Sequence, residues 1–101
     1  VCTDDLQLVA CGADIFYTDV WVSMGKEGES EWRSAQLAPY QINRDLLNLG
    51  APGALVMHCL PAYRGKEITD EVFEQHADLI FDQAENRLHV QKAILSLIAR
   101  S

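Results

Sequence analysis

The chain has 101 residues, 49% of them hydrophobic, and its formal net charge is −7. This length fits one small domain. The acidic balance argues against nucleic-acid and anionic-membrane partners, because both are bound through basic surfaces. No apolar run approaches the roughly 18 residues of a membrane helix. The chain starts without a signal-peptide pattern and as if inside a domain, so we expect it to be a fragment.

The three cysteines, Cys2, Cys11 and Cys59, form no CxxC pair. An odd count with this spacing disfavours a disulfide framework and favours a reducing compartment. A zinc site is also disfavoured, because His76 and His89 fall on predicted helices far along the chain, outside ligand spacing. We therefore expect no metal.

Apolar periodicity and turn residues divide the chain into alternating elements. The patterns predict helices over residues 4–12, 30–38, 43–50, 68–76 and 84–101, a loop over 23–31, and strands over 13–21, 54–59 and 78–81. Asp4, Asn43 and Thr69 are expected to cap three of these helices through side-chain oxygens. Ile68 and Phe73 stand at the two positions of a hydrophobic staple.

Strands separated by helices predict an α/β fold with a parallel sheet. We expect a Rossmann-like three-layer sandwich with helices on both faces, present here as a partial domain. Ligands of such sheets bind outside the carboxyl ends of the strands. Asp19 lies near the end of the first predicted strand, the pair His58 and Cys59 ends the second, and the segment after Phe81 follows the third. These three stretches should therefore converge on one rim.

Cys59 ends an apolar run, beside a turn imposed by Pro61. A lone cysteine in an apolar setting is usually an inert thiol, but the carboxyl end of a strand favours a functional role. Pro61 restricts Leu60 to extended backbone. A cis Leu60–Pro61 bond is a hypothesis that the sequence does not decide, since cis bonds before proline suit tight turns. His58 should face away from Cys59 and serve as a structural hydrogen-bonding residue.

Asp19 has two interpretations. It either caps the loop that follows or holds a cationic amine on the rim. In the second case, Ser23 would add a hydroxyl and Met24 a main-chain N–H group. Spacing alone favours the loop cap.

Arg87 is expected in the first turn of the last helix. A positive charge there opposes the helix dipole at a cost of roughly a few tenths of a kcal/mol, so something else must favour it. An anionic or carbonyl ligand and an ion pair with Glu85 or Asp82 explain it equally well.

The stretches "TDVWVSMG", "MHCLPAYRG" and "FDQAENRLHVQKAIL" together resemble the carboxyl-terminal part of the ornithine carbamoyltransferases, in the aspartate/ornithine carbamoyltransferase family. The resemblance covers essentially all 101 residues in the family's order. It implies that residues 1–101 form the carboxyl-terminal part of an ornithine-binding domain and end in its long C-terminal helix. The amino-terminal carbamoyl-phosphate domain is then absent.

Members of this family transfer the carbamoyl group of carbamoyl phosphate to the δ-amine of L-ornithine, giving citrulline and phosphate without a cofactor. The resemblance assigns the substrate contacts as follows: ornithine to Asp19, Ser23 and Met24, and carbamoyl phosphate to Cys59, Leu60 and Arg87. Cys59 is also the implied catalytic residue, a thiolate that takes the amine proton. Arg87 stabilises the charge that develops on the carbamoyl oxygen.

The family's Ser-Thr-Arg-Thr phosphate loop and His-Pro-x-Gln segment belong to the amino-terminal portion. We therefore expect the 101 residues alone to make no citrulline. For the complete protein, the resemblance implies a homotrimer. Arginine biosynthesis is the expected setting, but the sequence does not separate an anabolic from a catabolic role. Its expected location is the cytoplasm, or an organellar matrix if a transit peptide lies upstream.

Two alternatives stay open. One is another carbamoyl acceptor, such as putrescine, acetylornithine or aspartate. Cys59 disfavours aspartate, because the aspartate enzymes carry proline at that position. The stretch Ser23-Met24-Gly25 favours ornithine over putrescine, which has no α-carboxylate to hold. The other is a non-catalytic α/β module that binds a nucleotide or a partner. The presence of Cys59 and Arg87 counts against the second, whereas the absence of an upstream Ser-Thr-Arg-Thr segment would favour it.

Overall fold

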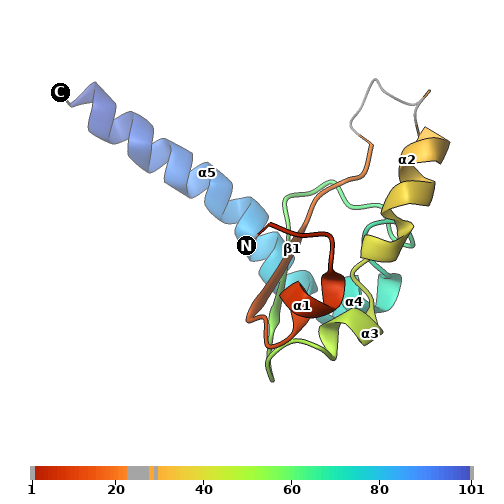
Figure 1. The fold of residues 1–101 in the computed structure, drawn as a ribbon. Coiled ribbons are helices and arrows are strands. Elements are labelled where there is room, and N and C mark those ends of the chain that lie inside the picture. The colour runs from red at the N-terminus through yellow and green to blue at the C-terminus, as the bar shows by residue number, and fades with distance from the viewer. Residues whose placement is uncertain (1, 23–27, 29, 101) are drawn as a thin grey trace.

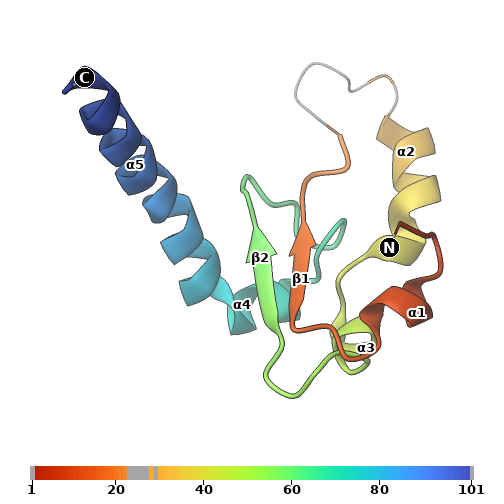
Figure 2. The same ribbon diagram turned by 60° about the vertical axis from the view of Figure 1, so that its left-hand side comes forward.

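The computed structural model describes residues 2–22, 28 and 30–100 (Figure 1). Its elements are α1 (Leu6–Ala10), β1 (Ile15–Thr18), α2 (Ser30–Leu37), the 3-10 helix η2 (Ala38–Tyr40), α3 (Arg44–Leu47), β2 (Leu55–His58), α4 (Asp70–Gln75) and α5 (Ala77–Ala99). Helices alternate with parallel strands, which confirms the predicted α/β class. In Figure 2, α5 lies beside β2, and α1 and α2 lie on the side of β1.

The two strands form one parallel sheet whose register runs from Ile15 opposite Leu55 to Thr18 opposite His58. The residues that follow Thr18 and His58 in the chain therefore leave the sheet side by side at its carboxyl end. This register is the local reason why two stretches forty residues apart can share one site.

One face of the sheet is buried and the other is partly open. On β2, Val56 and His58 are fully buried, whereas Leu55 is 44% exposed. The partial exposure of Leu55, at the start of β2, fits the partial domain that was predicted.

Helix starts follow the capping residues closely. The Asn43 side chain accepts a hydrogen bond from the Leu46 N–H at 2.9 Å, and the Thr69 hydroxyl accepts one from the Val72 N–H. Both predicted caps are confirmed. The first helix is capped by Asp5 instead of Asp4, one residue later than predicted.

The predicted third strand over residues 78–81 is wrong, because these residues lie in α5. Ile80 is fully buried, while the adjacent Phe81 is 54% exposed and packs edge-on against Phe73 with ring centroids 6.0 Å apart. A four-residue apolar run fits a buried strand or one turn of a helix equally well. Tertiary packing decided for the helix.

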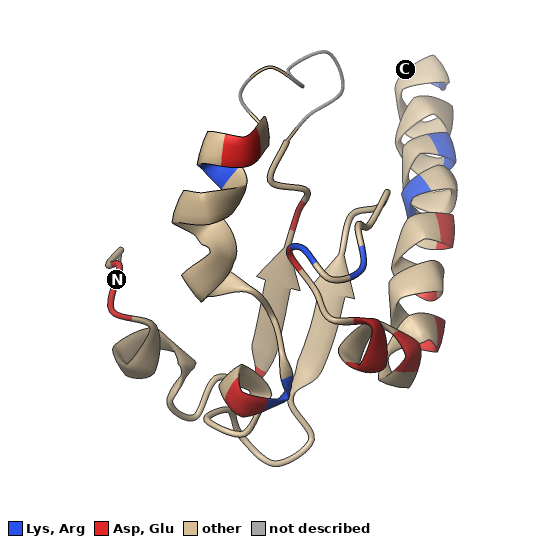
Figure 3. Cartoon of the chain, turned by 90° about the vertical axis from the view of Figure 1, so that its right-hand side faces the viewer, with Lys and Arg blue, Asp and Glu red and all other residues tan. Residues whose placement is uncertain are grey.

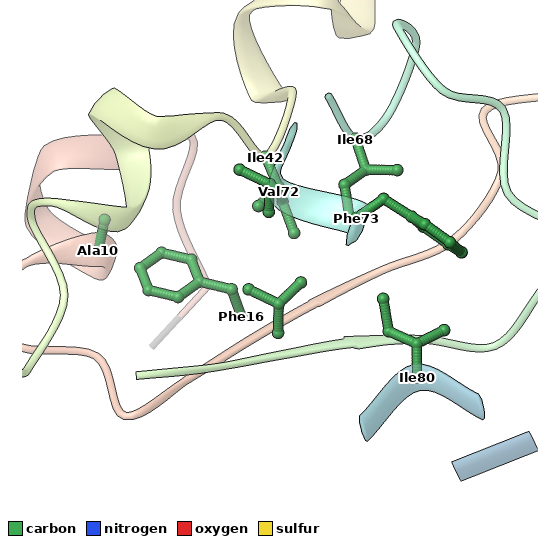
Figure 4. Packing of buried hydrophobic residues seen from close by; sticks show 8 residues of the cluster. Ala10, Phe16, Ile42, Ile68, Val72, Phe73 and Ile80 are labelled. Atoms are coloured by element: carbon green, nitrogen blue, oxygen red, sulfur yellow. The ribbon is translucent and has the colours of Figure 1, made fainter. Parts of the chain in front are cut away.

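The core is small and lies between the sheet, α4 and the start of α5. Its buried hydrophobic residues are Ala10, Phe16, Ile42, Val56, Ile68, Val72, Phe73 and Ile80. Figure 4 shows Ile68 and Phe73 close together above Ile80. Because Ile68 and Phe73 are both buried, the predicted hydrophobic staple of α4 is present.

The rest of α5 projects from this core (Figure 1). The radius of gyration is 16.0 Å, compared with about 13 Å for a compact domain of about 100 residues. Large apolar side chains on the projecting part stay exposed, among them Leu88, Leu95, Leu97 and Ile98. No helix in the described part of the chain is long and apolar enough to cross a membrane.

Acidic side chains gather on α4 and the adjoining start of α5 (Figure 3). Asp70 and Glu71 occupy the first turn of α4, where negative charge complements the helix dipole. Arg64 donates to Asp70 at 2.7 Å and lies over the Phe73 ring at 4.4 Å. These contacts fasten the loop after β2 to α4.

Candidate functional site

A cleft of about 250 Å³ opens at the carboxyl end of the sheet. It is lined by Asp19, Val20, Val22, Cys59, Leu60, Pro61, Tyr63 and Arg87. Four residues predicted from the sequence therefore lie around one cavity. Asp19 follows β1, Cys59 and Leu60 follow β2, and Arg87 is on α5. The predicted convergence of three separate stretches is confirmed.

A second cavity of about 260 Å³ shares Cys59 and Arg87 with the cleft. Its other lining residues are Tyr17, Gln83 and Ala84. Sequence reasoning missed Tyr17 and Gln83. Gln83 stands four residues before Arg87, a spacing that places both on one face of a helix. This spacing points to Gln83 only when α5 is known to include both residues.

Asp19 and Cys59 interact directly. Burial first, and then the hydrogen bond to Asp19 and the charge of that carboxylate, raise the pKa of the Cys59 thiol. The same hydrogen bond, together with the Val20 N–H at 2.6 Å from Oδ1, lowers the pKa of Asp19. At neutral pH the pair is therefore a carboxylate and a neutral thiol. The role of a Cys59 thiolate as proton acceptor stays a prediction; the Asp19 charge beside the sulfur disfavours the thiolate.

The two interpretations of Asp19 are both visible in the geometry. Its carboxylate accepts the Val20 N–H, which caps the start of the following loop, and it also faces the cleft. Cys59 is half-buried at the cleft wall. The sulfur is thus accessible from the cavity, unlike an inert core thiol.

His58 is the structural hydrogen-bonding residue that was predicted. It is fully buried, and its Nε2 lies 2.9 Å from Glu67 Oε1. The Leu60 N–H donates to its Nδ1 at 2.8 Å. Since Nδ1 accepts, the proton of the neutral ring is on Nε2, which donates to Glu67.

The turn after β2 has an unusual backbone. The Leu60–Pro61 bond is cis, which agrees with the hypothesis raised from the sequence, but Leu60 has φ +56° instead of the expected extended conformation. For a residue with a bulky side chain, this left-handed conformation costs roughly 1–2 kcal/mol. The hydrogen bond from the Leu60 N–H to His58 helps to hold it.

Arg87 is not in the first turn of its helix. It is the eleventh residue of α5, which begins at Ala77, so the argument from the helix dipole does not apply. Within residues 2–22, 28 and 30–100, Arg87 makes no ion pair. Glu85, one of the two partners considered, is instead 3.2 Å from His89. The guanidinium borders both cavities with its charge unpaired by these carboxylates.

Ser23 and Met24 lie outside the described residues, so their proposed contacts with ornithine stay predictions. The described part of the chain contains no cluster of three or more His, Cys, Asp or Glu residues suited to a metal ion.

Residues 1–98 match the family described as the Asp/Orn binding domain of aspartate/ornithine carbamoyltransferase. The chain belongs to this family. An ornithine carbamoyltransferase from Methanosarcina acetivorans is 54% identical over 98 residues, which are 97% of this chain and 32% of that protein. One from Archaeoglobus fulgidus is 59% identical over 83 residues, 82% of this chain and 27% of that protein. The chain thus spans about a third of the length of these relatives.

Solved structures share the fold. The anabolic ornithine carbamoyltransferase from Campylobacter jejuni superposes with a TM-score of 0.89 at 41% identity, covering 95% of this chain and 32% of that one. An N-acetyl-L-ornithine transcarbamylase complexed with PALAO superposes with a TM-score of 0.75 at 31% identity, over 94% of this chain and 29% of that one.

Proposed function

We propose that this chain supplies the ornithine-binding part of the active site of an ornithine carbamoyltransferase. The reaction transfers the carbamoyl group of carbamoyl phosphate to the δ-amine of L-ornithine and releases citrulline and phosphate. The observation that carries the proposal is the single cleft shared by Asp19, Cys59, Leu60 and Arg87. The names of the relatives from Methanosarcina acetivorans and Archaeoglobus fulgidus support ornithine as the acceptor.

In this proposal Asp19 and Cys59 prepare the amine. The Asp19 carboxylate attracts the δ-ammonium group of ornithine into the cleft. The positive charge of this group opposes the effect of Asp19 on Cys59 and favours the thiolate. As the ammonium group binds, Cys59 releases its thiol proton to solvent. The thiolate then takes a proton from the ammonium group, which leaves a neutral amine that can act as a nucleophile.

Leu60 and Arg87 act on the other substrate. The Leu60 carbonyl would accept a hydrogen bond from the carbamoyl NH2 group, and the Arg87 guanidinium would face the carbamoyl oxygen. Attack forms a bond from the amine nitrogen to the carbamoyl carbon. The bond from that carbon to the phosphate oxygen breaks with its electron pair on the phosphate, and the nitrogen gives its extra proton to the departing phosphate. Arg87 stabilises the negative charge that develops on the carbamoyl oxygen in between.

A related acceptor is the second candidate. The likeness to the N-acetyl-L-ornithine transcarbamylase, at 31% identity, supports acetylornithine. The identity to the Methanosarcina acetivorans ornithine carbamoyltransferase is higher, at 54%, and supports ornithine more strongly. We therefore place acetylornithine second, with putrescine after it.

We also propose an anabolic role, in arginine biosynthesis, which the name of the Campylobacter jejuni relative supports. A homotrimer fits the exposed apolar side chains on α5, since such surfaces mark interfaces. The three free cysteines fit the cytoplasm or an organellar matrix, where thiols stay reduced.

The test is a chimera in which residues 1–98 replace the matching segment of the Methanosarcina acetivorans relative. We expect citrulline synthesis from ornithine and carbamoyl phosphate, and slower carbamoylation of acetylornithine and putrescine. Cys59→Ala should abolish most of this activity, whereas Cys11→Ala, at an exposed cysteine outside the cleft, should retain it. A folded chimera without carbamoylation of any acceptor would favour a non-catalytic module. The 101-residue chain alone is expected to be inactive.

A further inference from the structure

The loop after β2 forms half of the cleft, and side chains set its path. Cys59, Leu60, Pro61 and Tyr63 all lie within residues 59–67, beyond the end of the strand. The Leu60 N–H donates to His58 Nδ1 at 2.8 Å, and the Tyr63 N–H donates to Glu67 Oε1 at 2.7 Å. The geometry of the cleft wall therefore depends on two buried side chains, those of His58 and Glu67.

Glu67 links both ends of this turn through one oxygen. Its Oε1 accepts the Tyr63 N–H and also the Nε2–H of His58, at 2.9 Å. Because Nε2 carries the proton, Nδ1 of the same ring is available for the Leu60 N–H. A single carboxylate oxygen thus determines the tautomer that holds Leu60 in its left-handed conformation.

Glu67 is itself held from outside the loop. Its main-chain carbonyl accepts the Ile42 N–H at 2.9 Å. Gln41 donates through Nε2 to the carbonyls of Gly65 and Lys66, at 3.1 and 2.7 Å. These hydrogen bonds fix the loop before α4 against residues 41 and 42, so the cleft wall depends on the position of the segment before α3.

The carboxylate is a costly choice for this place. Glu67 is completely buried, and its Oε2 has no hydrogen-bond partner among the described residues. A buried polar group without a partner destabilises a protein. Packing alone would be served at lower cost by an apolar side chain, so the role of Glu67 lies in what Oε1 holds.

We propose that Glu67 is a positioning residue for the carbamoyl transfer, acting through His58 and the Tyr63 N–H to place Cys59 and Leu60 in the cleft. This inference rests on the proposed function. Glu67 does not line either cavity that Cys59 and Arg87 share, so it acts without touching the substrates.

The experiment compares variants of the chimera. Glu67→Gln keeps an oxygen acceptor at the same reach, whereas Glu67→Met keeps the length and removes the acceptor. Glu71→Met, at an exposed glutamate of α4, is the matched control. We expect kcat to fall about 100-fold in E67M, as displacements of about 1 Å cause. In E67Q and E71M we expect it to stay near that of the unaltered chimera.

Hydrogen–deuterium exchange of peptides covering residues 59–67 gives a readout that needs no turnover. Exchange should be faster in E67M than in E67Q, with peptides from α5 unchanged. A folded E67M variant with the kcat and the exchange of the unaltered chimera would overturn the proposal. If E67M does not fold, Glu67→Asp decides in the same way, since it keeps the charge and shortens the reach.

The two proposals fail separately. If the unaltered chimera makes no citrulline, the proposed function fails, and with it the catalytic part of this inference. The exchange data then decide alone whether Glu67 holds the turn. If the chimera is active and E67M is equally active, only the positioning role is refuted.

Discussion

Replacing Arg87 by methionine in the chimera tests the most specific role assigned to the cleft. The guanidinium borders both cavities beside Cys59 and, within the described residues, has no ion-pair partner that shares its charge. A cation and an oxyanion 4 Å apart attract by about 1 kcal/mol in bulk water and about 4 kcal/mol near a protein surface. Arg87 is exposed, so the loss should fall between these limits. Since about 1.36 kcal/mol is tenfold in rate, kcat should fall about fivefold to about a thousandfold.

The assay is citrulline formation at saturating ornithine and carbamoyl phosphate, with variants of equal thermal stability. Lys92→Met is the control, because Lys92 is an exposed cation on the same helix that lines neither cavity. Arg87→Lys should recover part of the rate, since it keeps a charge without the planar donor fork. A kcat for R87M equal to that of K92M would show that Arg87 does not stabilise the transition state.

Three further outcomes are expected. With the other two cysteines replaced by serine, alkylation of Cys59 should be slow at neutral pH, because its raised pKa keeps the thiol protonated. Asp19→Asn removes the hydrogen bond and the charge, so the rise in alkylation rate should shift to lower pH. An unchanged pH profile would contradict this. Gly50→Ala should destabilise the chain by about 1–3 kcal/mol in urea unfolding, because an added Cβ would come within 2.6 Å of the Phe16 ring. Gly28→Ala is the control and should be tolerated, because no described atom lies within 4 Å of the added Cβ. Thr69→Ala should lower the free energy of unfolding by about 0.5–2 kcal/mol through loss of the α4 cap, and an unchanged unfolding midpoint would rule that out.

Much of the site was predictable because strand ends are local features. A run of apolar residues that stops at His58 marks the carboxyl end of a parallel strand, and Asp19 marks another. The rule that such ends share a rim then brings Asp19 and Cys59 together. The cis bond before Pro61 follows from the same local turn. These inferences needed no long-range contact beyond the parallel pairing.

The protonation of the site was not predictable in this way. Burial of Cys59, and then its hydrogen bond to Asp19, raise the pKa of the thiol, and the parallel register of β1 and β2 brings the two residues together. The role of Glu67 was hidden for a related reason. A glutamate in a polar loop normally faces solvent, and nothing nearby in the chain shows that its carboxylate lies under the turn.

By itself, the sequence determined the strand ends, two helix caps, the hydrophobic staple and the family to which the chain belongs, because each depends on residues close together in the chain. Only the tertiary structure decided that residues 78–81 are helical, that Arg87 reaches the cleft from the middle of α5, and that Glu67 lies buried between His58 and Tyr63. These features arise from packing between distant segments, where burial of Ile80 and satisfaction of buried polar groups outweigh local preference.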